Sequence, residues 1–150
     1  MPIDFSAGSV NYVDCATGWV WPDRVRKEFI YRASGSFAYF RVGSVPVTAT
    51  IGMVVGKSGR TTGLTSGRVI DVNASLRVNF GGGRFANFRD QIAIRGLNGD
   101  FSTGGDSGSL IWTWDSHRRP VALLFAGGGG VTFGNKIARV LAALDVELVT

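Results

Sequence analysis

The chain has 150 residues, of which 45% are hydrophobic and 18% are charged, so it is long enough to bury one core and too apolar for a disordered protein. Its 16 Lys and Arg outnumber its 11 Asp and Glu and give a formal net charge of +5. Because the basic residues are scattered rather than gathered in a stripe with interleaved aromatic residues, the charge favours acidic partners in general and does not predict a nucleic-acid-binding protein.

The first residues, "MPIDFSAGSVNY", lack the basic start and the long apolar run of a secretion signal. No later stretch approaches the length of a membrane-spanning helix, so no membrane partner is expected. Cys15 is the only cysteine, which excludes an intrachain disulfide and a cysteine-based metal site and is compatible with the cytoplasm.

Residues 11–50 give a weaker pattern than the rest of the chain. The stretch "NYVDCATGWVW" at 11–21 predicts one strand. The stretch "PDRVRKEFIYRA" at 22–33 fits either a short helix that starts at Pro22 or a helix followed by a strand. Residues 33–50 mix turns with short apolar runs. No linker or repeat separates this segment from the rest of the chain, so we interpret it as an appendage to the domain formed by residues 51–150.

From residue 51 onward, short apolar, β-branched or aromatic runs alternate with Gly, Asn, Asp and Ser, which is typical of an antiparallel β domain. Strands are predicted at 51–57, 65–72, 76–80, 89–95, 107–114 and 120–126. The first hairpin is expected to turn between Gly59 and Gly63. Six short strands favour a small closed barrel, because closure removes the exposed edges of a sheet.

After Asn135 the apolar residues recur at helical spacing, at positions 137, 140, 141 and 144. A short helix is therefore predicted to end the domain, with the Asn135 side chain available as its N-cap. The stretch "AGGGG" at 126–130 holds more glycine than turns alone require.

The stretch "FSTGGDSGSLIW" at 101–112 frames a serine with glycines. Alone, it fits a turn that enters a strand. It also fits acyl transfer, because glycines 104 and 105 allow backbone N–H groups to point at an oxyanion beside Ser107 Oγ. An esterase elbow is disfavoured, since Ser109 stands where Gly-x-Ser-x-Gly needs its last glycine. The stretch "KSGRTTG" at 57–63 lacks the spacing of a phosphate-binding loop and predicts a hairpin turn.

The motif "GGDSGS" at 104–109, with "KSGRTTGLTSGRV" at 57–69 and "RRPVALLFAGGG" at 118–129, resembles the C-terminal barrel of trypsin-like serine proteases of the chymotrypsin fold, in their disulfide-free bacterial form. The stretch "NYVDCA" at 11–16 is similar to the strand that carries the catalytic aspartate of that family. The resemblance implies an all-β fold in which residues 51–150 form a six-stranded antiparallel barrel with a short C-terminal helix. Residues 1–50 are then a remnant of the N-terminal barrel and the connection between the barrels.

Carried onto this sequence, the resemblance implies that Ser107 is the nucleophile and that the Gly105 and Ser107 N–H groups form the oxyanion hole. Asp106 is expected to be a buried carboxylate that braces the loop. Asp14 is expected to orient the catalytic histidine.

The resemblance also implies a substrate pocket lined by Phe101, Phe125, Ala126 and Gly127. Phe101 stands where a trypsin-like preference for Lys or Arg needs an acid at the pocket base. An apolar or small side chain is therefore the expected guest.

The histidine of this family precedes the aspartate in the chain, whereas the only histidine here is His117. It lies past the far end of the strand that Ser107 is predicted to start, on the order of 25 Å away at 3.3 Å per residue. This leaves two hypotheses. The chain is the C-terminal part of a serine endopeptidase that acts on peptides or proteins, inactive alone, with its base in a missing N-terminal barrel or a second copy. Alternatively, it is a non-catalytic peptide-binding or scaffold protein derived from that fold. Neither hypothesis involves a metal or a cofactor.

Overall fold

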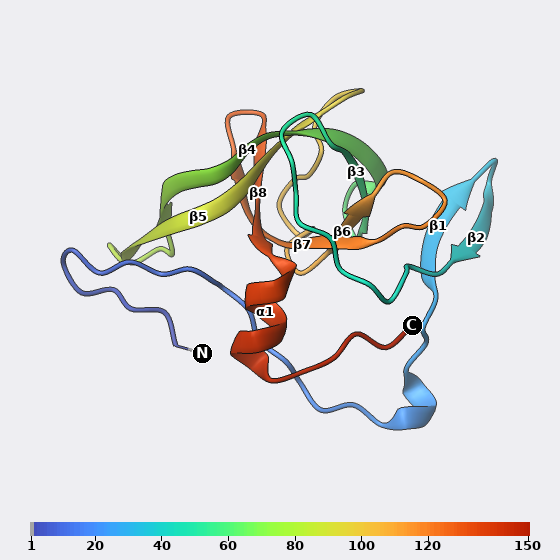
Figure 1. Cartoon of the computed structure of the whole chain (residues 1–150), viewed down its shortest axis with the longest axis horizontal. Helices are drawn as coiled ribbons and strands as arrows, with labels where there is room; N and C mark the ends of the chain where they lie inside the picture. The colour runs from blue at the N-terminus through green and yellow to red at the C-terminus, as the bar shows by residue number, and fades with distance from the viewer. Residues whose placement is uncertain (1) are drawn as a thin grey trace.

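The structure is a computed structural model that describes residues 2–150. Within them, six antiparallel strands close into a barrel in the order β3-β4-β5-β8-β7-β6 (Figure 1). The strands are β3 (Val54–Gly59), β4 (Gly63–Asn79), β5 (Phe85–Gly96), β6 (Leu110–Thr113), β7 (Pro120–Gly128) and β8 (Val131–Lys136). The helix α1 (Ile137–Leu144) follows β8 directly. The predicted all-β class, the closed barrel and the terminal helix are confirmed.

Three of the strand predictions are wrong in detail. The strands predicted at 65–72 and 76–80 are one strand, β4, whose pairing with β5 is interrupted by register shifts between residues 69 and 76. Such bulges bend a strand without ending it, which is why the sequence pattern breaks there. The strand predicted at 107–114 begins only at Leu110, because residues 107–109 belong to a turn.

The sixth strand of the barrel, β8, was not predicted. Its sequence "VTFGNK" contains Gly134 and Asn135, two residue types that are depleted in strands. A Cβ added at Gly134 would lie 2.9 Å from the Ala122 Cβ. The glycine therefore allows β7 and β8 to approach closely.

The Asn135 side chain does not cap α1, in contrast to the sequence prediction. The residue at the N-cap is Lys136, which makes no side-chain capping bond. The Asn135 side chain is fully buried and instead bonds to Gln91 and to the Asp14 N–H.

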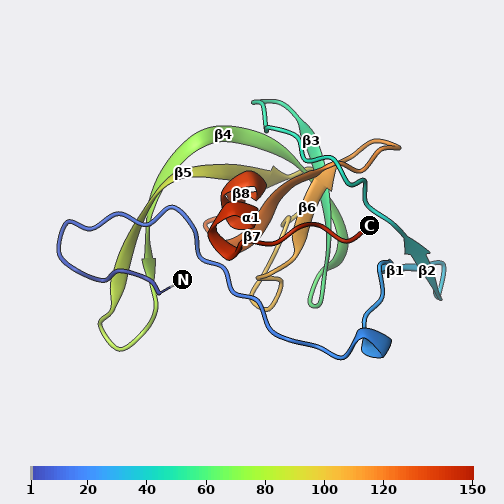
Figure 2. The same cartoon turned by 60° about the horizontal axis from the view of Figure 1, so that its bottom comes forward.

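Residues before the barrel form little regular structure. The segment predicted as a strand at 11–21 is extended, with one bridge between Asn11 and Phe88. A single 3-10 turn, η1 (Pro22–Arg24), precedes a hairpin of β1 (Phe29–Ala33) and β2 (Ser36–Phe40). Of the two alternatives for 22–33, the helix followed by a strand is therefore the closer one, with the helix reduced to one 3-10 turn. In both views this hairpin stands beside the barrel, while residues 2–21 run past α1 (Figures 1 and 2).

Two apolar clusters hold these parts together. The larger fills the barrel and includes Val55, Val69, Ile92, Ile94, Phe101, Ile111, Val121 and Leu124. The smaller joins Val13 and Cys15 to Ile137 and Val140 of α1. The smaller cluster therefore attaches the N-terminal segment to the end of the barrel. Within residues 2–150, no helix is both long enough and apolar enough to cross a membrane.

Gly67 of β4 faces the barrel core without space for a side chain. A Cβ added there would lie 2.7 Å from Ile94 Cγ2 and 2.7 Å from Phe101 Cδ2, and both of these residues are buried. Gly67→Ala is expected to lower the free energy of unfolding by about 1–3 kcal/mol through overpacking, as measured by urea denaturation. The matched control is Gly18→Ala, because an added Cβ at Gly18 meets nothing within 4 Å; equal stability of the two variants would contradict this close packing at Gly67.

Candidate active site

The loop that carries Ser107 is built from two successive turns. The Asp106 N–H donates to the Thr103 oxygen at 3.2 Å, and the Ser109 N–H donates to the Asp106 oxygen at 3.1 Å. Gly105 and Gly108 have φ values of +98 and +87, in the left-handed region that favours glycine. Gly105 and Gly108, on either side of Asp106 and Ser107, therefore allow the chain to reverse twice within a few residues.

Asp106 points inward, as predicted, and is 1% exposed. Its Oδ1 accepts hydrogen bonds from the N–H groups of Thr61 (2.8 Å) and Thr62 (3.2 Å). Its Oδ2 accepts from the Thr62 hydroxyl (2.7 Å) and from the Thr103 N–H (3.1 Å). The carboxylate therefore links its own loop to the turn between β3 and β4.

Lys57 of β3 supplies the counter-charge of Asp106, and its side chain is completely buried. Its Nζ lies 3.6 Å from Asp106 Oδ2 and donates to the Thr62 hydroxyl and, at 2.9 Å, to the Gly63 oxygen. Burial lowers the pKa of Lys57, and the Asp106 carboxylate opposes that shift. This cation was not recognised in the sequence, where "KSGRTTG" indicates only a hairpin turn.

The pKa of Asp106 reflects these contacts. Burial alone would raise it, but the hydrogen bonds from the Thr62 hydroxyl and from the Thr103, Thr61 and Thr62 N–H groups outweigh burial and lower the pKa from 3.8 to about 2. Asp106 is thus an anion across the physiological range and cannot act as a base for Ser107 at neutral pH.

Several N–H groups of the same loop have no backbone acceptor within the described part of the chain, among them those of Gly104, Gly105 and Ser107. Among residues 2–150, backbone hydrogen bonds use the N–H groups of Asp106, Gly108 and Ser109, and none uses those of Gly105 and Ser107. Gly105 and Ser107 are the residues to which the family resemblance assigns the oxyanion-hole donors. A Cβ added at Gly105 would lie 2.3 Å from Arg60 Nη2 and 2.5 Å from Thr61 Oγ1, so a larger residue would displace the loop.

A cavity of about 430 Å³ adjoins Ser107 and contains all four of the predicted pocket residues, Phe101, Phe125, Ala126 and Gly127. Phe101 is only 1% exposed, so it contributes little surface. The sequence reasoning missed Ser102 and Thr132, which also line the cavity and whose hydroxyl oxygens lie 2.6 Å apart. Their hydroxyls make the interior of the cavity partly polar, and Asp100 adds a carboxylate to its lining.

Asp14 is anchored to the barrel through two buried amides. Its N–H donates to Asn135 Oδ1 at 3.0 Å, and Asn135 Nδ2 donates to Gln91 Oε1 at 2.7 Å. Gln91 Nε2 in turn donates to the Tyr12 oxygen at 2.9 Å. Both amide side chains are fully buried. We call this pair the amide bridge; it fixes residues 12–14 to β5 and β8.

The Asp14 carboxylate itself makes no hydrogen bond or ion pair with the residues that the structure describes. Partial burial raises its pKa. Since no fully buried side-chain oxygen of the described residues lacks a partner, the Asp14 oxygens remain accessible to solvent and to a hydrogen-bond donor from another group. Groups with a shifted pKa are found preferentially at functional sites.

The structure does not join Asp14 to Ser107 directly. Asn135 of β8 pairs with Leu123 of β7, and Leu123 pairs with Leu110 of β6. Strands lie about 4.8 Å apart, so Asn135 and Leu110 are separated by about 10 Å. Ser107 lies three positions before Leu110, so the two predicted catalytic residues belong to neighbouring parts of one barrel wall.

His117 lies beyond the opposite end of β6 from Ser107. Its side chain is 76% exposed, with Nδ1 3.9 Å from Asp115 Oδ1. It is therefore not placed to accept the Ser107 proton. Among residues 2–150, no group of three or more His, Cys, Asp and Glu is arranged to hold a metal ion.

The fold is that of the chymotrypsin-like serine proteases. The chain is similar to Cellulomonas bogoriensis chymotrypsin (TM-score 0.62, 23% identity, covering 75% of this chain and 57% of that one). It is also similar to Thermobifida fusca protease A (TM-score 0.66, 22% identity, 83% and 61%) and to a Nocardiopsis protease (TM-score 0.63, 22% identity, 83% and 61%). The chain thus spans 57–61% of the length of these structures. No protein-family model and no curated protein matches the sequence.

The ion pair between Asp106 and Lys57 leads to a prediction about pH. Asp106→Asn is expected to lower the free energy of unfolding at neutral pH by about 3–5 kcal/mol, because it leaves a buried lysine without its counter-charge. Since the folded-state pKa of Asp106 is depressed from 3.8 to about 2, its contribution is complete above pH 4 and is lost as the pH falls towards 2. Urea denaturation of both proteins across this range should therefore show the stability gap narrowing in acid.

The double variant Lys57→Met/Asp106→Asn is the control for that prediction. Its loss of stability should be smaller than the sum of the two single losses by about 1 kcal/mol or more, because the two sites are coupled. Strict additivity, or a gap independent of pH, would show that the carboxylate does not stabilise the loop in this way.

The amide bridge leads to a prediction about Cys15, which is buried beside Asp14. Asn135→Ala removes the acceptor of the Asp14 N–H and leaves Gln91 without its donor. Local opening should therefore increase about tenfold, given that an unsatisfied buried polar group costs about 1–3 kcal/mol. The rate at which Cys15 reacts with a disulfide reagent should rise accordingly in native buffer. Asn98→Ala, at an exposed position, is the matched control and should leave the Cys15 reaction rate unchanged. If the faster reaction in Asn135→Ala is accounted for by its lower global stability alone, the amide bridge does not hold this segment locally.

Proposed function

We propose that this chain is the C-terminal part of a serine endopeptidase, with Ser107 as the nucleophile and the Gly105 and Ser107 N–H groups as the oxyanion hole. The observation that carries the proposal is the loop itself. A buried ion pair and four hydrogen bonds to Asp106 hold it, while the two N–H groups needed for acyl transfer are left without a backbone partner. A turn with a purely structural role has no need of that combination.

The course of β7 supports an extended peptide as the substrate. Its first half pairs with β6 up to Leu123, and the Gly108 N–H still reaches the Leu124 oxygen at 2.7 Å. From Phe125 to Gly128 the strand pairs only with β8, so one edge is open beside the cavity that contains Ser107. A peptide can add to such an edge as a further strand, which places its side chains in the neighbouring cavity. We propose that this cavity takes an apolar or small side chain.

The base in this proposal is a histidine from outside this chain. It would remove the Ser107 Oγ proton as the oxygen bonds to the substrate carbonyl carbon, and would then protonate the leaving amine. Asp14 is the residue we assign to orient that histidine, because its carboxylate is half buried without a partner. An imidazole N–H is a suitable donor for it.

The surface before the hairpin is consistent with a protein partner. Trp19, Val20 and Trp21 are 75%, 49% and 64% exposed. The centres of the two indole rings lie 4.3 Å apart in an edge-to-face arrangement. Contiguous exposed apolar groups of this kind commonly mark interaction surfaces. We propose that an N-terminal barrel, or a second copy of the chain, covers them and supplies the histidine.

Free imidazole provides a direct test, because it can take the place of the absent histidine ring. The purified chain alone is expected not to hydrolyse peptides. With a p-nitrophenyl ester and added imidazole, Ser107 should become acylated, and mass spectrometry of the intact protein and its fragments should locate the acyl group there. Acylation should fall in Asp14→Ala, because the imidazole is no longer oriented.

Two variants complete this test. Ser107→Ala should abolish the modification, and Ser75→Ala, at an exposed serine of β4, should leave it unchanged. Acylation spread over exposed serines, or none at Ser107 in the folded protein, would contradict an assembled oxyanion hole. Steady peptide hydrolysis by the chain alone that Ser107→Ala abolishes and His117→Ala preserves would show that the base lies within this chain.

A further inference from the structure

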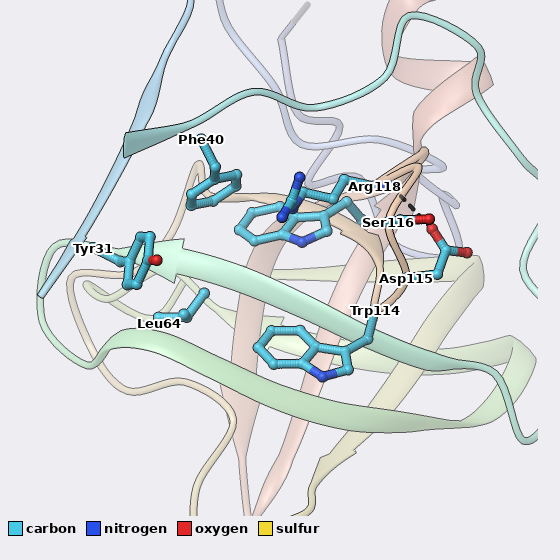
Figure 3. A pocket seen from close by; sticks show the side chains of 8 residues that line it. Tyr31, Phe40, Leu64, Trp114, Asp115, Ser116 and Arg118 are labelled. Atoms are coloured by element: carbon cyan, nitrogen blue, oxygen red, sulfur yellow. Dashed lines mark hydrogen bonds between the residues drawn. The ribbon is translucent and has the colours of Figure 1, made fainter. Parts of the chain in front are cut away.

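A second cavity, of about 320 Å³, lies between the β1–β2 hairpin and the barrel (Figure 3). None of the residues that line it lines the cavity beside Ser107. Four of its walls are aromatic rings: Tyr31 of β1, Phe40 of β2, Trp112 of β6 and Trp114, which follows β6. This volume falls within the range of pockets that hold small ligands.

The aromatic walls are fixed by packing. The centre of the Phe40 ring lies 5.0 Å from the centre of the Trp112 ring and 5.7 Å from that of the Tyr31 ring. Trp114 lies against Gly56 of β3, where an added Cβ would come within 2.3 Å of Trp114 Cε3. The glycine therefore makes room for this indole. The cavity is preformed and does not require a ligand to assemble it.

Arg118 places a positive charge among these rings. Its guanidinium carbon lies 5.4 Å from the centre of the Phe40 ring, and Figure 3 shows the side chain extending towards that ring. No carboxylate of residues 2–150 lies within 4.0 Å of its nitrogens. The backbone of Arg118 is held by Asp115 Oδ1 and by the Gly43 N–H. A half-buried cation is thus presented without a counter-ion.

Asp115 does not neutralise this cation, although it also lines the cavity. Its Oδ1 accepts from the Thr113 hydroxyl (2.9 Å) and from the N–H groups of His117 (2.9 Å) and Arg118 (3.0 Å). In Figure 3 its carboxylate lies on the loop side, away from the rings. Of the polar groups that remain for a ligand, the guanidinium and the Trp114 indole N–H can only donate hydrogen bonds, and the hydroxyls of Tyr31 and Ser116, which also line the cavity, can donate as well as accept.

We propose that this cavity binds an apolar carboxylate: a ring or short hydrocarbon group, enclosed by Trp114 and Tyr31, whose single carboxylate pairs with Arg118. Guanidinium and carboxylate match in a two-point geometry, and the aromatic walls bury the apolar part. The net charge of +5 favours the approach of an anion. Two sources offer this chemistry, a free small acid and the C-terminal carboxylate of a peptide that ends in an apolar residue. The proposal does not depend on Ser107.

The test compares 3-phenylpropionate with 3-phenylpropionamide, which have the same shape but differ in charge. Each is titrated into the folded chain while the tryptophan fluorescence and the indole N–H signals in NMR spectra are followed. We expect saturable binding of the acid, with at least tenfold weaker binding of the amide, since hydrogen bonds to charged groups are worth about 1.5–3 kcal/mol. Arg118→Met should remove this preference, and Arg119→Met, at an exposed neighbour that does not line the cavity, should preserve it.

Arg118 has a φ of +45, so Arg118→Asn serves as a second variant, because asparagine tolerates this backbone region. A parallel titration uses an acetylated tripeptide ending in phenylalanine, as free acid and as amide. Tighter binding of the peptide acid than of 3-phenylpropionate indicates a peptide C-terminus as the source, and the reverse order indicates a free small acid. The proposal is overturned if neither acid binds saturably to the folded chain at millimolar concentration. Equal affinity for acid and amide, or binding that both Arg118 variants leave unchanged, would equally overturn it.

Discussion

The buried carboxylate of Asp106 is the group on which the candidate active site depends. It accepts hydrogen bonds from two loops that are far apart in sequence and pairs with a lysine whose side chain is also fully buried. Removing two charges from water is costly, and only good geometry with further hydrogen bonds compensates for it. Here the Thr62 hydroxyl accepts from Lys57 and donates to Asp106, so both charges are satisfied. The backbone of residues 103–109 is shaped by that constraint.

Two further buried polar side chains attach the N-terminal segment to the barrel. Gln91 and Asn135 are fully buried, and their amides hold the N-terminal segment against the barrel. Among the described residues, no buried side-chain nitrogen or oxygen lacks a partner. Thr113 and Thr132 are the other buried polar side chains on barrel strands, and the main cluster within the barrel is apolar. The fully buried charged and amide side chains thus lie at two positions, the loop that carries Ser107 and the Asp14 segment, which are the two places where the proposed chemistry needs fixed geometry.

The sequence predicted the parts of this arrangement that depend on local pattern. Short β-type runs and turn residues predict the barrel, and the family resemblance carried by "GGDSGS" predicts the inward Asp106. The local pattern could not give β8, because Gly134 and Asn135 are chosen for contacts with other strands rather than for strand propensity. The same reason explains the error of assigning Asn135 as a helix cap. The role of Lys57 was missed because a lysine in a hairpin normally faces water, and only the barrel topology reveals that it faces Asp106.

The closure of the barrel has a consequence for the order of events during folding. The first and last strands of the barrel sheet, β3 and β6, pair with each other, and the hydrogen bond from the Thr61 N–H to Asp106 joins residues 45 positions apart. Contacts of such sequence separation form late, because the entropy of the intervening loop must be lost first. The serine loop therefore acquires its shape only when the barrel has closed. A nascent or partly folded chain therefore holds Ser107 and the Gly105 N–H in a backbone that does not yet have the geometry of the finished loop.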